Sequence, residues 1–213
     1  MIAIIAILAA LAVPALTSAL AKAQQTGTMN NARQLYLAQF QMSNDGTATG
    51  DATLAWPGDL PGGPPATLQA YVNDVVGPRY LKGADVSKLF SAPSCNLTCN
   101  IVLGPPESVT FTSGAGTGAL KVHPLRDVDP SNTIFCTSRN YVYDTALVGA
   151  NVPYGTKGFI VMHKGGDGVV FKSGQATTAG WANAQTFENN VGFATGGAPG
   201  APVPGDPAAT MIY

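Results

Sequence analysis

Charged side chains are scarce in this sequence. They make up 11% of its 213 residues, against about a quarter in an average soluble domain, and the formal net charge is −1. Without a basic stripe, the chain is not expected to bind nucleic acid. Without a run of lysines and arginines, it is not expected to carry a polybasic patch for anionic lipid. The composition therefore argues against two classes of electrostatic partner.

Catalytic signatures are lacking too. The sequence contains no Gly-x-Ser-x-Gly, no His-Glu-x-x-His and no P-loop, and it has only 2 histidines. His123 precedes Pro124 at the end of an expected strand and is interpreted as structural. His163 is expected in a solvated turn at the tip of a hairpin. We therefore predict a protein that is not an enzyme.

Cysteine is rare, with only Cys95, Cys99 and Cys136. An apolar N-terminal export segment would place the body of the chain outside the cytoplasm, where disulfides persist. We therefore expect a disulfide, with one thiol left over and a pairing that the sequence does not assign. Free thiols and a metal site are the alternatives, although Cys-Asn-Leu-Thr-Cys lacks the paired ligand clusters of structural zinc.

What the sequence does have is a long uncharged stretch that precedes Lys22. In a helix, its 21 residues would cover about 32 Å, the hydrocarbon thickness of a bilayer. We predict one helix from Met1 to about Ser43, interrupted at Pro14 because an interior proline removes a hydrogen bond. The turn-forming residues 44–46 are expected to end it.

After Lys22 the pattern becomes amphipathic. The predicted apolar face holds Met29, Ala32, Leu35 (or Tyr36) and Phe40, and polar side chains occupy the other side. Gly27 is a weak point between the two halves. This half of the helix is expected to pack on the rest of the protein.

Glycine (25) and proline (16) are plentiful, which favours a body rich in turns and short strands. We predict an α+β fold in which a long N-terminal helix packs on a small antiparallel sheet with extensive loops. Residues 1–44 would form the helix and residues 45–213 a β-rich head. A short helix is expected at Pro65–Val75. The expected strands are Ser108–Thr112, Leu120–His123, Thr133–Cys136, Tyr141–Tyr143 and a hairpin of Phe159–Met162 with Val169–Phe171.

The first 46 residues resemble the N-terminal segment of type IV pilin-like proteins, and among these the type II secretion pseudopilins. The similarity lies in the run Ile2–Leu16, with its proline, and in the polar stretch from Met29 to Gly46. It implies a pilin-like fold and a structural filament subunit. The helix–helix packing would then be made by Ile2, Ile4, Ile5, Ile7, Leu8, Leu11, Val13, Pro14 and Leu16.

The resemblance also implies partners and a location. The subunit would wait in the inner membrane and then join a helical homo-oligomer, periplasmic or extracellular, with other pilins or pseudopilins and an inner-membrane assembly platform. In the family, the processed first residue and a nearby glutamate would lie upstream of Met1, and Ile5 stands where that glutamate would be if Met1 were the processed end. We therefore expect the true start to lie upstream; the alternative is a subunit that dispenses with the glutamate contact.

Two further features of the head remain open. Related pseudopilins can hold calcium in a loop, which makes Asp127 and Asp129 candidate calcium ligands, although a solvated turn is the alternative. Residues Asn96-Leu97-Thr98 fit a glycosylation sequon. Aside from calcium, no cofactor is expected.

A second function competes with the filament subunit. Ala19-Leu20-Ala21 before Lys22 fits the small-x-small cleavage site of a secretory signal peptide. The chain would then be a secreted or membrane-anchored extracytoplasmic binding module whose apolar N-terminus only directs export. Against this, no basic residue precedes the apolar run and the helical pattern continues past Lys22.

Overall fold

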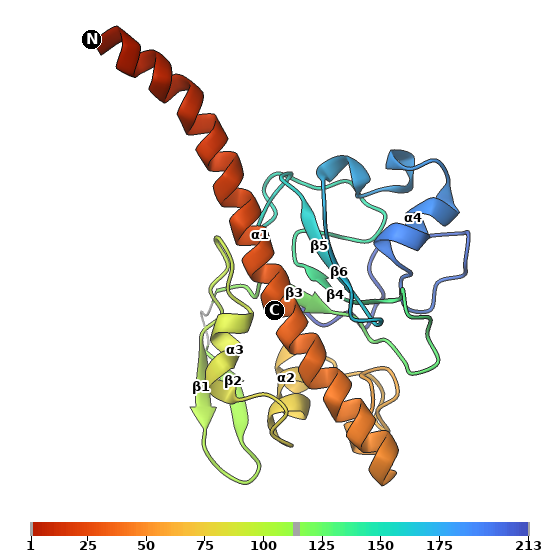
Figure 1. The fold of residues 1–213 in the computed structure, drawn as a ribbon. Coiled ribbons are helices and arrows are strands. Elements are labelled where there is room, and N and C mark those ends of the chain that lie inside the picture. The colour runs from red at the N-terminus through yellow and green to blue at the C-terminus, as the bar shows by residue number, and fades with distance from the viewer. Residues whose placement is uncertain (1, 113–115, 213) are drawn as a thin grey trace.

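The computed structural model describes residues 2–112 and 116–212, with side chains in the N-terminal helix from residue 12 onward. One helix, α1 (Ile2–Thr49), projects from a head formed by the rest of the chain (Figure 1). The remaining helices are η1 (Ala52–Leu54), α2 (Leu68–Val76), α3 (Gly83–Leu89), η2 (Ser173–Gln175), η3 (Thr178–Gly180) and α4 (Ala184–Val191). The strands are β1 (Cys99–Val102), β2 (Ser108–Phe111), β3 (Leu120–Val122), β4 (Ile134–Ser138), β5 (Phe159–His163) and β6 (Gly168–Phe171).

Helix α1 continues through Pro14, so the interruption predicted there is wrong. Proline has no amide hydrogen, but the loss of one bond in a helix of 48 residues leaves the remaining ladder in place. The hydroxyl group of Thr17 donates to the Pro14 carbonyl oxygen at 2.9 Å. Helix α1 is therefore continuous from its N-terminal half to the half that packs on the head.

The end of α1 also differs from the prediction. Asn44-Asp45-Gly46 stays helical, and the helix ends at Thr49, just before Gly50, whose φ of 73° is the left-handed conformation that glycine adopts most easily. The Asp45 carboxylate accepts a hydrogen bond from the Tyr80 hydroxyl at 2.7 Å. Gly46 packs on η1, where an added Cβ would lie 2.9 Å from that of Leu54. Tertiary contacts thus hold these turn-prone residues in the helix.

The fold class is α+β, as predicted, but with two antiparallel sheets in place of one. Strands β3-β4-β5-β6 form one sheet in sequential order, and β1 and β2 form a separate ribbon. The predicted hairpin is confirmed, with Phe159 opposite Phe171 and Met162 opposite Gly168. In Figure 1, the four-stranded sheet lies on one side of α1, and α2, α3 and the ribbon lie on the other.

The structure differs from the local predictions at three segments. Tyr141–Tyr143 is not a strand, because this segment forms turns that direct two tyrosine rings into the core. Strand β1 was not predicted, because most of its side chains are exposed and only pairing with β2 supports it. Helix α4 was also missed, although Asn183 caps it by accepting the Thr186 amide at 2.8 Å.

The main core lies beneath the C-terminal half of α1. Ala32, Leu35 and Met42 are buried there among side chains from α2, α3 and the sheet. The Tyr36 ring packs against Trp56 and against Phe135 of β4, at centroid distances of 6.4 and 5.8 Å. Such aromatic contacts add to the stabilisation from burial of the rings. The amphipathic prediction is therefore confirmed for this face, except that Phe40 is 42% exposed.

A second core lies between the outer part of the sheet and α4. The Tyr141 and Phe159 rings stack at 3.9 Å, and Phe159 stacks on Phe171 at 5.2 Å. Phe187 of α4 packs edge-on against Tyr143. The loop containing Tyr141 and Tyr143 thus joins α4 to the sheet.

Within the residues whose side chains are described, the structure contains no helix long and apolar enough to cross a membrane. The predicted span over residues 1–21 begins in residues 1–11, whose side chains lie outside that set.

Candidate functional site

The described N-terminal part of α1 exposes its side chains to solvent where the helix projects from the head. All side chains from residue 12 to residue 20 are exposed, and the first buried one is that of Gln25. Val13, Leu16 and Leu20 are 59%, 71% and 57% exposed. Of the predicted assembly residues, Val13, Pro14 and Leu16 are described and lie on this free segment. The side chains of Ile2, Ile4, Ile5, Ile7, Leu8 and Leu11 lie outside the described set.

Hydrogen bonds fix the helix to the head just after this segment. The hydroxyl groups of Thr28 and Tyr154 lie 2.6 Å apart, and the Tyr154 hydroxyl also donates to the Gln24 carbonyl oxygen at 3.1 Å. Further along, the Tyr36 hydroxyl donates to the Lys164 carbonyl oxygen at 2.7 Å. Because these bonds lie on one side of α1, they set the direction in which its apolar end leaves the head.

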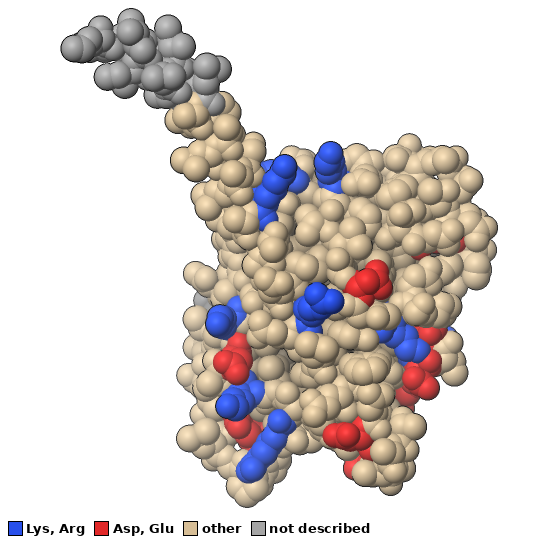
Figure 2. All heavy atoms as spheres, viewed as in Figure 1, with Lys and Arg blue, Asp and Glu red and all other residues tan. Residues whose placement is uncertain are grey.

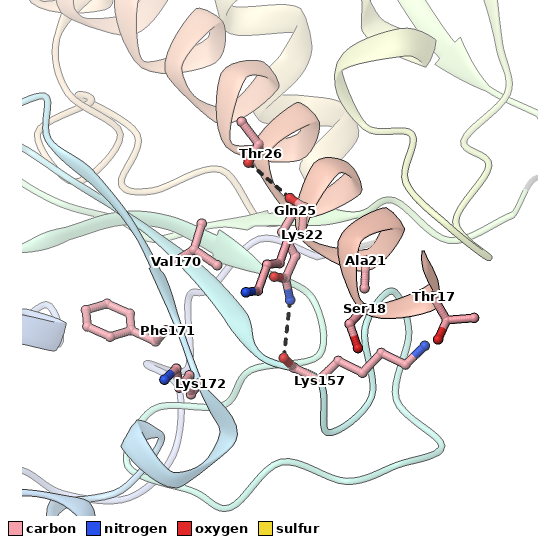
Figure 3. A pocket seen from close by; sticks show the side chains of 10 residues that line it. All are labelled: Thr17, Ser18, Ala21, Lys22, Gln25, Thr26, Lys157, Val170, Phe171 and Lys172. Carbon is pink, nitrogen blue, oxygen red and sulfur yellow. Dashed lines mark hydrogen bonds between the residues drawn. The ribbon is translucent and has the colours of Figure 1, made fainter. Parts of the chain in front are cut away.

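A groove of about 570 Å³ lies at this junction, which we call the neck groove (Figure 3). One wall is α1 and the other is the end of β6 with the turn before β5. Gln25 bridges the two walls by donating to the Lys157 carbonyl oxygen at 3.4 Å. The lining residues are Thr17, Ser18, Ala21, Lys22, Gln25, Thr26, Lys157, Val170, Phe171 and Lys172.

The neck groove corrects the expectation that the protein has no basic patch. Lys22, Lys157 and Lys172 are far apart in the sequence, but all three line the groove and are exposed, and no acidic side chain lines it. None of the three forms an ion pair with any residue that the structure describes. Figure 2 shows basic side chains where α1 leaves the head, without acidic ones beside them on this face. The sequence had no signal for this cluster, because only the fold unites its members.

Asp127 and Asp129, the candidate calcium ligands, lie in a loop that contacts the ammonium group of Lys164. The Lys164 ammonium group donates to the Asp129 carbonyl oxygen at 2.8 Å and also to that of Asp127. The Asp129 carboxylate accepts from the Arg126 amide at 2.7 Å and pairs with its guanidinium group at 3.1 Å. Across the described residues, no group of three or more His, Cys, Asp or Glu side chains is arranged for a metal. The arrangement fits the alternative of a turn, in which the Lys164 ammonium group provides the positive charge that the loop contacts.

The three cysteines are free thiols, so the expected disulfide is not formed. Each sulfur has a different environment. The Cys99 sulfur lies 3.0 Å from the Ser87 hydroxyl, and that of Cys95 lies 3.8 Å from the Thr117 hydroxyl. Cys136 is fully buried on β4, and burial raises the pKa of its thiol strongly. These environments depend on how three segments pack together, so no local sequence pattern distinguishes them.

Both histidines are buried, which corrects the expectation of a solvated turn for His163. Its Nδ1 lies 2.6 Å from the Asp167 carboxylate and its Nε2 lies 3.1 Å from the Val191 carbonyl oxygen, so it ties the hairpin to α4. His123 lies beside β3, with Nε2 3.4 Å from the Thr137 hydroxyl. Burial lowers the pKa of His123 to about 4, opposed in part by Asp206 and reinforced by Lys121.

Comparison of the chain with family models, with curated proteins and with solved structures finds no significant match.

Proposed function

We propose that this protein is a structural subunit of a filament that assembles through its N-terminal helices, as in a type IV pilus-like fibre or a type II secretion pseudopilus. The supporting observation is the division of α1 into a free half that exposes Val13, Leu16 and Leu20 and a half that is buried in the head. Apolar side chains exposed along one helix need a cover, either of lipid or of other helices.

The free half of α1 can be covered either by lipid or by neighbouring helices. In a bilayer, the apolar stretch before Lys22 has the length to reach across the hydrocarbon layer. In a fibre, its many alanines allow neighbouring helices to approach closely, and the larger aliphatic side chains fill the space between them. A contact of this kind joins different surfaces on successive copies, and it generates an open helical array when the rotation between copies does not close into a ring. The heads would then form the outside of the fibre, in contact with periplasm or medium.

A pair of charge substitutions tests the proposal. Leu16→Asp places a carboxylate on the free half, where its side chain is 71% exposed, and Val128→Asp does the same on a loop of the head, at 81% exposure. After removal of detergent, we expect the wild type and Val128→Asp to sediment as filaments visible by negative-stain electron microscopy, and Leu16→Asp to stay in solution or aggregate without order. Circular dichroism should show that both variants keep the native head.

Two results would contradict the proposal. One is ordered filaments from Leu16→Asp that match those of the wild type. The other is a mass spectrum of the exported protein that shows cleavage after Ala21, because that would remove the free half and support the secreted binding module.

A further inference from the structure

We propose that the neck groove binds the phosphate headgroup of an anionic phospholipid and so positions the head against the membrane before assembly. The inference rests on the membrane-anchored state in the proposed function, and it adds a ligand class and a site. Three lysines line this one groove, and no acidic side chain lies in its lining.

The groove lies at the depth where headgroups would be found. Lys22 follows Leu20 by two residues and Leu16 by six, which correspond to about 3 and 9 Å along a helix. The headgroup layer occupies about 5–8 Å on each side of the hydrocarbon core. If Leu16 and Leu20 lie at the edge of that core, the ammonium group of Lys22 reaches the phosphates, as long basic side chains at membrane interfaces do.

The other wall of the groove supplies the remaining charge. Figure 3 shows the Lys157 side chain extending towards Thr17 and Ser18 on α1, and Lys172 at the end of β6 on the far side of the gap. A phosphate between the walls could meet ammonium groups from both the helix and the head. The hydroxyl groups of Thr17 and Ser18 provide further donors for its oxygens.

The mixed character of the groove favours a lipid over a free anion. Val170 is 41% exposed and lines the groove with the half-buried Ala21, so apolar surface adjoins the lysines. A phospholipid can cover this surface with its glycerol and upper acyl carbons, whereas inorganic phosphate cannot. Each lysine near an anionic surface is worth about fivefold in affinity.

The experiment uses the full chain in micelles of a neutral maltoside detergent. Three ligands are titrated: dihexanoylphosphatidylglycerol, dihexanoylphosphatidylcholine and inorganic phosphate. Binding is followed by amide chemical shifts in nuclear magnetic resonance, with the Trp181 indole as a second reporter, since its ring lies 6.2 Å from that of Phe171. We expect the phosphatidylglycerol to shift groove residues at concentrations at least tenfold below those of the other two ligands.

Matched double variants separate the effect of the groove lysines on binding from the effect of the protein's net charge. Lys157→Gln with Lys172→Gln removes two groove lysines, and we expect it to weaken phosphatidylglycerol binding about 25-fold. Lys82→Gln with Lys88→Gln removes the same charge from α3 and its N-terminus, outside the groove. This control should change the affinity less than twofold. Both double variants change exposed side chains, so native circular dichroism is expected for each.

Several outcomes would overturn the inference. Equal affinity for the two lipids would show that the headgroup charge does not matter. Equal losses of phosphatidylglycerol affinity in both double variants would show that the groove lysines have no special part. Inorganic phosphate that binds as well as the phosphatidylglycerol would indicate a free-anion site. A fourth titration uses a soluble polyglutamate peptide, and tighter binding of this peptide than of the phosphatidylglycerol would indicate an acidic protein partner.

This outcome is separable from that of the filament assay. If Leu16→Asp abolishes filaments while the groove variants bind lipid like the wild type, only the lipid site fails. If the lipid binds as expected but the wild type forms no filament, the proposed function fails and the site remains.

Discussion

The hydroxyl groups of Thr28 on α1 and Tyr154 on the head lie 2.6 Å apart in a buried contact. Because the Tyr154 hydroxyl donates to the Gln24 carbonyl oxygen, the Thr28 hydroxyl is the donor in this pair. The two bonds are the first firm attachment of the helix to the head after its exposed half. They hold one wall of the neck groove against the other.

Removal of the tyrosine hydroxyl tests this attachment. Tyr154→Phe loses both bonds and leaves a buried threonine hydroxyl without its acceptor, so we expect about 1–2 kcal/mol of lost stability in urea unfolding. Thr28→Val alone should cost less. The double variant should cost no more than Tyr154→Phe, since the shared bond is already gone. Strictly additive losses would show that the two hydroxyl groups act independently.

Two glycines in and after α1 should respond to alanine in opposite ways. Gly27 is exposed within the helix, with no atom within 4 Å of an added Cβ, so Gly27→Ala should stabilise the protein by about 0.5–1 kcal/mol. Gly50 has a φ of 73°, so Gly50→Ala should destabilise it by about 1–2 kcal/mol. Each variant is the control for the other in thermal unfolding. Equal effects of the same sign would contradict the assignment of the helix end.

Buried His123 should make stability depend on pH. Its pKa is about 4 in the folded protein against 6.5 in the unfolded chain, so the unfolded chain binds the additional proton between these values. Stability from this group is complete above pH 6.5 and is lost as the pH falls towards 4. We expect a loss of about 2 kcal/mol between pH 7 and pH 5 in the wild type.

The His123→Gln variant isolates this contribution, because it retains His163 and every carboxylate. Urea unfolding at pH 7 and pH 5 should show a much smaller pH dependence in the variant than in the wild type. The same dependence in both proteins would assign it to other groups.

Thiol counting tests the state of the cysteines. Unreduced protein unfolded in guanidinium should react with three equivalents of Ellman's reagent, because Cys95, Cys99 and Cys136 are free. In native protein we expect Cys99 to react first, since it is half-buried while the other two are buried. A Cys99→Ser variant should lose this fast phase. A single thiol in the unfolded, unreduced protein would establish the disulfide that the sequence favoured.

The helix and the central hairpin could be predicted because local patterns carried them. The apolar positions around Ala32 and Leu35 recur at helical spacing, and Phe159–Met162 and Val169–Phe171 flank a Gly-Gly-Asp-Gly tip. The same reasoning was wrong for Tyr141–Tyr143. Aromatic residues favour strands, but this segment lies in turns from which the two tyrosine rings enter the core. Helix α4 had a usable signal in the Asn183 cap and in Phe187 and Val191 four residues apart.

The sequence by itself determined the division of the chain into an uncharged N-terminal helix and a head of short strands, because composition and periodicity are local properties. It also determined that no single run of basic residues exists. Only the tertiary structure decided that Lys22, Lys157 and Lys172 share one groove, that Lys164 provides the cation for the loop of Asp127 and Asp129, and that His163 is buried. These arrangements join residues far apart in the chain, and packing of α1 against the sheet sets their distances.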